Sequence, residues 1–276
     1  MKITVQEIKK RKHTQTPLVM LTSYDYPTAC IEDRCNVDIQ LVGDSVGTNV
    51  LGYESIRQVT VEDIEHHTGA VSRGAKHSFV LSDMPYNSYQ TPRNALTTAR
   101  RLIKAGSDGV KIEGEQEVIP IIQSLTDEGI AVCGHIGYTP QTKSTRVHGK
   151  NFQEATMLLD AARRIEQAGA FAIVLELIPE QLAHMITTAI SIPTFGIGAG
   201  RYCDGQVQVV LDILGMNSRS FRHTHAFGNL SQMMEKAIEA YSTDVAEGRF
   251  PTEKNASRLP DETLTKIKNY ISSQSW

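Results

Sequence analysis

Short apolar runs recur along this chain, and each is separated from the next by a longer stretch with helical character. Continuous apolar runs without in–out alternation are typical of strands buried on both faces of a parallel sheet. An eighth run, Val207–Leu214, is weaker than the others. The seven clear runs are Leu18–Thr22, Val37–Val42, Ser78–Leu81, Gly109–Ile112, Ile130–Cys133, Phe171–Leu175 and Ile192–Ile197.

The stretches between these runs predict helices, several of which are followed by glycine, the residue favoured just past a helix end. Alternating strands and helices predict a parallel sheet wrapped by helices, and eight such units in roughly 200 residues predict a closed (β/α)8 barrel. We expect a single barrel domain over about residues 14–228, with a helical appendage over about residues 229–276. The helical candidates are Pro92–Lys104, Gln116–Glu128, Asn151–Ala168, Pro179–Ala189, Leu230–Glu247 and Leu264–Ser272.

Charge and cysteine usage exclude several classes of protein. The chain has 28 Lys and Arg against 31 Asp and Glu, a net charge of −3, whereas binders of nucleic acid or anionic membranes are basic. Its four cysteines form no CxxC pair, which argues against a zinc knuckle or a disulfide framework. No signal peptide and no membrane-spanning run is evident. We therefore expect a cytoplasmic protein that binds neither nucleic acid nor membrane.

Polar and charged side chains follow the apolar runs, at the points where the strands are expected to end. In a barrel the carboxyl ends of all strands meet at one mouth, where active sites lie. One aspartate after a strand is usually a helix N-cap. Six strand ends in phase instead predict that most of these residues line one site. They include Asp44, Ser45, Asp83, Lys111, Glu113, His135 and Glu176.

The residue types at these strand ends indicate a chemistry. Asp44, Asp83 and Glu113 offer only oxygen ligands, which suit Mg²⁺ better than zinc. A metal bound there could be chelated by a substrate with adjacent keto and carboxylate oxygens, and would stabilise the enolate formed by deprotonation. Lys111 would supply a positive charge for the substrate carboxylate, and Glu176, beside apolar neighbours, could act as the base. The residues thus predict metal-assisted enolisation of a small keto acid, or a lyase or aldol-type transfer built on it.

Several segments, taken together and in order, resemble the ketopantoate hydroxymethyltransferase family. The resemblance runs from about residue 14 to 214 and implies a barrel of the phosphoenolpyruvate/pyruvate class. The matching segments are Leu21–Tyr26 (LTSYDY), Leu41–Gly47 (LVGDSVG), Leu81–Tyr86 (LSDMPY), Val110–Gly114 (VKIEG), Cys133–Gly137 (CGHIG), Val174–Glu176 (VLE) and Phe195–Gly200 (FGIGAG).

The resemblance also implies an activity and its participants. Members of that family transfer a hydroxymethyl group from 5,10-methylenetetrahydrofolate, as co-substrate, to 3-methyl-2-oxobutanoate, giving 2-dehydropantoate on the route to pantothenate and coenzyme A. It implies one Mg²⁺ per subunit and a homo-oligomer, typically a decamer.

Roles carry over residue by residue from the same resemblance. Asp44, Asp83 and Glu113 match the family's metal-site carboxylates, and Asp44 and Asp83 also match its substrate ligands. The remaining matches are Ser45 with the residue that joins Asp44 at the substrate carboxylate, Lys111 with the substrate-binding lysine, His135 with the site histidine and Glu176 with the proton acceptor.

Other functions stay open. Residues 142–150, 220–227 and 251–259 depart from the family pattern, so a paralogue acting on another 2-oxo acid or one-carbon donor is one alternative. A lyase of the same barrel class is a second alternative, although no cysteine-bearing loop of the kind such enzymes use is evident. An inactive scaffold is a third; the clustered carboxylates argue against it, because they repel one another unless a cation is bound.

Overall fold

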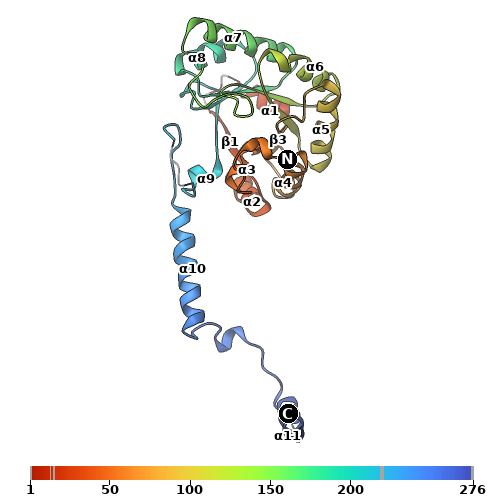
Figure 1. Ribbon diagram of the computed structural model, residues 1–276, viewed down its shortest axis with the longest axis vertical. Helices are drawn as coiled ribbons and strands as arrows, with labels where there is room; N and C mark the ends of the chain where they lie inside the picture. Colours follow the sequence, from red (N-terminus) through yellow and green to blue (C-terminus); the bar gives the residue numbers. More distant parts are fainter. Residues whose placement is uncertain (1, 13, 15, 218–220, 275–276) are drawn as a thin grey trace. The chain divides into compact units, whose positions relative to one another are not determined.

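The computed structural model describes residues 2–12, 14, 16–217 and 221–274 (Figure 1). The chain forms two compact units, Met1–Gly228 and Asn229–Trp276.

The first unit is the predicted barrel. Eight parallel strands close in the order β1 to β8, and pairing of Leu18 with Gly205 joins the last strand to the first. Helices lie around the outside (Figure 1). The strands are β1 (Leu18–Thr22), β2 (Ile39–Val42), β3 (Phe79–Asp83), β4 (Gly109–Glu113), β5 (Val132–Gly137), β6 (Ala172–Glu176), β7 (Thr194–Ile197) and β8 (Gly205–Gln208).

The helices begin where capping side chains precede them. Thr91, for example, accepts a hydrogen bond from Asn94 N at the start of α5, with proline in the first turn. Gly106 ends α5 at φ 114°, in the left-handed region that favours glycine. The helical elements of this unit are α1 (Val5–Lys10), α2 (Tyr26–Arg34), α3 (Val46–Asn49), η1 (Ile56–Gln58), α4 (Val61–Gly74), α5 (Pro92–Ala105), η2 (Gln116–Val118), α6 (Ile119–Asp127), α7 (Phe152–Gln167), α8 (Glu180–Ala189) and α9 (Val210–Ile213).

Two apolar clusters hold the barrel together. One fills its interior and includes Met20, Leu81 and Phe195, all less than 2% exposed. The other lies between the strands and the surrounding helices and includes Leu102, Ile122 and Ile165. Strands buried on both faces explain why the apolar runs show no alternation.

The eighth run differs from the prediction. The strand covers Gly205–Gln208, two residues earlier than expected, and Val210–Ile213 forms the short helix α9. The run Val207–Leu214 therefore combines the end of a strand and a helix. Periodicity alone does not separate a short buried strand from a buried helix segment, which is the reason for the error.

The second unit contains α10 (Leu230–Ala246), η3 (Glu253–Asn255) and α11 (Asp261–Ser273). The bounds of α10 and α11 agree with those of the two predicted helices to within three residues. Among the described residues, no helix is long and apolar enough to cross a membrane.

Candidate active site

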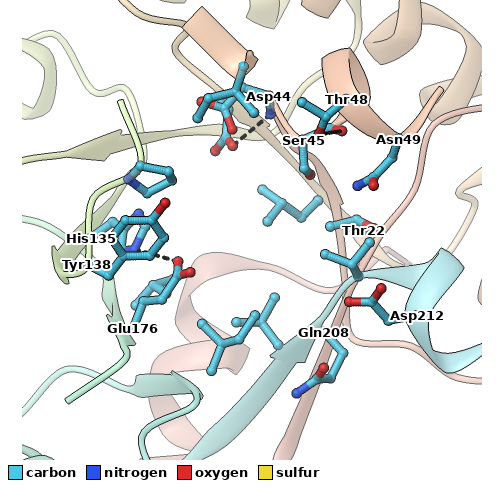
Figure 2. A pocket seen from close by; sticks show the side chains of 18 of the residues that line it. Thr22, Asp44, Ser45, Thr48, Asn49, His135, Tyr138, Glu176, Gln208 and Asp212 are labelled. Carbon is cyan, nitrogen blue, oxygen red and sulfur yellow. Dashed lines mark hydrogen bonds and ion pairs between the residues drawn. The ribbon is translucent and has the colours of Figure 1, made fainter. Parts of the chain in front are cut away.

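A cavity of about 630 Å³ opens at the carboxyl ends of the barrel strands. All seven side chains singled out from the sequence line it, together with residues that the sequence did not indicate. Figure 2 shows His135, Tyr138 and Glu176 on one side, with Asp44 and Ser45 near the top, and Thr22, Gln208 and Asp212 across the cavity.

The register of the sheet brings these residues together. Asp83, Glu113 and Glu176 are the last residues of β3, β4 and β6. Asp83 is paired with Lys111 on the neighbouring strand, and Glu113 is paired with His135. Asp44 and Ser45 follow β2 after one intervening residue, Gly43. Residues far apart in sequence therefore meet because their strands end at the same level.

A buried lysine lies among the carboxylates. Lys111 Nζ lies 2.8 Å from Asp83 Oδ1, and Asp83 Oδ2 accepts a hydrogen bond from Asp44 N over 3.0 Å. Burial alone would lower the pKa of Lys111, but the charges of Asp83, Asp44 and Glu113 outweigh it and raise that pKa. Lys111 therefore stays charged.

Repulsion within this charge cluster acts on Asp44. Burial, followed by repulsion from Asp83 and Glu113, raises the pKa of Asp44 to about 8. Its Oδ2 accepts a hydrogen bond from the side chain of Gln141 over 2.8 Å, which compensates part of the cost of ionisation. A cation near these three carboxylates would relieve their repulsion.

Glu113, His135 and Glu176 form a second chain of contacts. His135 Nε2 lies 3.1 Å from Glu176 Oε2, and its Nδ1 lies 3.4 Å from Glu113 Oε2. Burial and Lys111 would lower the pKa of His135, but the two carboxylates outweigh them and raise it. Glu176 is the more exposed partner, with 18% of its side chain accessible against 3% for His135. Its carboxylate is thus the one that an incoming molecule meets.

Ser45 is held by a tyrosine. Its hydroxyl lies 2.8 Å from Tyr24 Oη, and burial raises the pKa of Tyr24 to about 12, so that phenol stays protonated. The contact fixes Ser45 beside Asp44 at the rim of the cavity.

Gly137 allows the strands to approach closely at the mouth. Its φ is 96°, and a Cβ at this position would lie 2.2 Å from the carbonyl oxygen of Glu176. Any side chain there would displace β6 and, with it, the Glu176 carboxylate.

The three carboxylates supply the oxygen donors that Mg²⁺ prefers, but they do not form a preformed coordination site. Among the described residues, no group of three or more His, Cys, Asp or Glu is arranged to hold a metal ion. Oxygens of Asp44, Asp83 and Glu113 instead accept hydrogen bonds from the Gln141 side chain and from backbone N–H groups, and Asp83 also forms an ion pair with Lys111. The donor set is all oxygen and net negative, as a hard cation requires.

Comparison with known proteins gives a consistent result. The sequence model of the ketopantoate hydroxymethyltransferase family matches residues 2–253. The chain is 46% identical to a 3-methyl-2-oxobutanoate hydroxymethyltransferase of Dehalococcoides mccartyi strain 195, over 99% of this chain and 100% of that protein. It is 45% identical to the protein of the same name from Clostridium acetobutylicum, over 97% and 99% of the two chains.

This chain belongs to the ketopantoate hydroxymethyltransferase family. Solved structures agree on the fold: a phosphoenolpyruvate phosphomutase from Streptomyces platensis subsp. rosaceus superimposes with a TM-score of 0.61 at 14% identity, covering 98% of this chain and 96% of that one. A 2,3-dimethylmalate lyase of the PEP mutase/isocitrate lyase superfamily gives 0.57 at 14% identity, covering 98% and 100%. The predicted (β/α)8 barrel fold is confirmed.

Sequence reasoning missed Gln141 and Tyr89, which support the carboxylates of this family member. Gln141 N donates to Glu113 Oε1 over 2.6 Å, and Tyr89 Oη donates to Gln141 Oε1 over 2.6 Å. The only signal for Gln141 was its place in the loop after β5, at the same mouth. Tyr89 lies in the loop after β3 and carries no pattern of its own.

The segments that depart from the family pattern fall in different places. Residues 142–150 border a smaller pocket beside the mouth, where His148 stacks on Tyr138, a lining residue of the main cavity. Phe221 lines the main cavity, whereas Ser220 lies outside the described residues. Residues 251–259 belong to the second unit.

Proposed function

We propose that this chain transfers a hydroxymethyl group from 5,10-methylenetetrahydrofolate to 3-methyl-2-oxobutanoate, forming 2-dehydropantoate. Membership of the family and full-length relatives named 3-methyl-2-oxobutanoate hydroxymethyltransferase support the proposal. One structural observation carries it: an accessible carboxylate, Glu176, shares a single cavity with a buried lysine and three buried carboxylates.

The 3-methyl-2-oxobutanoate binds where positive groups can compensate the charge of its carboxylate. Lys111 supplies a fixed positive charge for its carboxylate, and Ser45 offers a hydroxyl at the rim. Asp44, Asp83 and Glu113 would hold Mg²⁺, which when bound supplies Lewis-acid polarisation of the 2-oxo group.

Glu176 acts as the base. Its carboxylate takes the proton from C3 of the acid, and the C–H electron pair passes into the enolate of the adjacent 2-oxo group. His135, in contact with Glu176 Oε2, keeps the carboxylate oriented and leaves Oε1 for the proton.

A carbon–carbon bond then forms. The enolate carbon attacks the one-carbon unit carried by the folate as one carbon–nitrogen bond breaks, and water displaces the second nitrogen and supplies the hydroxyl oxygen of the product. The two nitrogens of the departing tetrahydrofolate take up the proton held by Glu176 and one proton from water. The cavity of about 630 Å³ leaves space beside a small oxo acid for part of this second ligand.

The direct test is mass spectrometry of the product. The protein is incubated with Mg²⁺, 3-methyl-2-oxobutanoate and 5,10-methylenetetrahydrofolate, with a parallel sample containing a chelator. We expect 2-dehydropantoate at many turnovers in the first sample and a large loss in the second. If no product forms, the proposed acceptor or donor is wrong, and the alternative of a different 2-oxo acid or one-carbon donor takes its place.

We also propose a cytoplasmic homo-oligomer, a decamer by family resemblance. Light scattering coupled to size exclusion measures the mass directly. A monomer at micromolar concentration would contradict this part of the proposal.

A further inference from the structure

Gln141 hydrogen-bonds to two of the three clustered carboxylates, Asp44 and Glu113, and all of its hydrogen-bonding groups have a partner. Its Nε2 donates to Asp44 Oδ2 over 2.8 Å and to the carbonyl oxygen of Met84 over 3.1 Å. Its backbone N–H donates to Glu113 Oε1, and its carbonyl oxygen accepts from Arg57 Nε over 2.7 Å. Gln141 is 2% exposed, so water does not compete for these groups.

The hydrogen-bond partners allow only one orientation of the Gln141 side-chain amide. Asp44 Oδ2 and the Met84 carbonyl are both acceptors, so they need the NH₂ end of the side chain. The opposite end, Oε1, then needs a donor. Tyr89 Oη lies 2.6 Å from Oε1 and 3.1 Å from its other acceptor, the carbonyl oxygen of Glu113, so its single hydrogen goes to the nearer Gln141 Oε1. Burial raises the pKa of Tyr89 above its ordinary value, so the phenol remains a donor.

Removing the Tyr89 hydroxyl would destabilise this orientation of the Gln141 amide. A buried amide oxygen without a partner is costly, and rotation of the side chain would relieve the cost. Rotation would turn an oxygen toward Asp44 and toward the carbonyl oxygen of Met84, which can only accept, so both hydrogen bonds made by Nε2 would be lost. The orientation of the Asp44 carboxylate thus depends on a hydroxyl that does not touch it.

We propose that Tyr89 is a positioning residue for the cation site, acting through Gln141 on Asp44. The inference rests on the proposed function, since it requires that Asp44, Asp83 and Glu113 bind a divalent cation.

Binding of Mn²⁺ to the full-length protein tests the proposal without turnover. Free Mn²⁺ is measured by electron paramagnetic resonance, and thermal unfolding checks that each variant is folded. For Tyr89→Phe we expect the Kd for Mn²⁺ to rise about tenfold, the scale of losses at groups that orient metal ligands. The control is Tyr86→Phe, which removes a nearby hydroxyl but keeps the ring beneath the Arg57 guanidinium, and should change the Kd less than about twofold.

A double-mutant cycle separates positioning through Gln141 from a general structural effect. Gln141→Met should weaken Mn²⁺ binding at least as much as Tyr89→Phe, and adding Tyr89→Phe to it should cause no further loss. An unchanged Kd in Tyr89→Phe, or additive losses in the double variant, would overturn the inference alone. A wild-type protein that does not bind Mn²⁺ would overturn both the inference and the proposed function.

Discussion

His135 Nε2 lies 3.1 Å from Glu176 Oε2. The other ring nitrogen of the same histidine lies 3.4 Å from Glu113 Oε2, so one imidazole joins the proposed base to the carboxylate cluster. The two groups come from neighbouring strands, β5 and β6, whose register places Gly137 opposite Glu176. The proposed base is therefore held by the barrel itself and not by a loop.

Asp83→Asn tests the proposed cation site. The substitution keeps the side-chain shape but removes the charge that faces Lys111 and the hydrogen-bond acceptor most favourable for Asp44 N. We expect kcat/KM to fall by more than about a hundredfold. The far-UV circular dichroism should keep its native form. Asp160→Asn, on an exposed position of α7, is the control and should keep full activity. Native turnover in Asp83→Asn would contradict the ligand assignment.

Asp33 stabilises the barrel away from the site, and its contribution depends on pH. Burial would raise the pKa of Asp33, but hydrogen bonds from Ser78 and His77 outweigh it and lower the pKa to about 2. The stability gained is therefore complete above the ordinary value of 3.8 and is lost as the pH falls toward 2. Asp33→Asn should lower the free energy of unfolding at pH 7 by about 2 kcal/mol. Urea titrations should show the difference from wild type shrinking below pH 4; a difference that does not vary with pH would refute the assignment.

The contribution of Glu32 to stability depends on pH in the opposite direction to that of Asp33. It is 4% exposed on α2, and its two carboxyl oxygens have no hydrogen-bond partner among the described residues. Burial raises its pKa to about 9, so ionisation favours the unfolded chain, and stability is lost as the pH rises from about 4.5 toward 9.

Glu32→Gln should therefore stabilise the protein at pH 7 by an amount on the order of 3 kcal/mol. The gain should vanish near pH 4, as followed by thermal unfolding across that range. Glu239→Gln, on exposed α10, should show no such pH dependence. Equal stability of Glu32→Gln and wild type at pH 8 would contradict the buried, neutral carboxyl.

The sequence predicted the parts of the molecule that follow from local pattern. The run Leu18–Thr22 matches β1 residue for residue, and Asp44 and Glu176 share one cavity, as expected for residues at the carboxyl ends of barrel strands. Gln141 was not predicted, because its contact with Asp44 joins positions 97 residues apart. Such a contact depends on how a loop folds back over the mouth, and a single glutamine in a loop has no periodicity to reveal it.

We propose that this cavity enolises a 2-oxo acid with Glu176 as the base. Solvent exchange at C3 of 3-methyl-2-oxobutanoate measures that step alone, by proton NMR in D₂O with Mg²⁺ and without folate. We predict rapid loss of the C3 proton signal with wild type and with Glu180→Gln, a control outside the cavity, and a rate lower by about 10²–10⁴ with Glu176→Gln. Exchange by Glu176→Gln at the wild-type rate would contradict the account, because another group would then be the base.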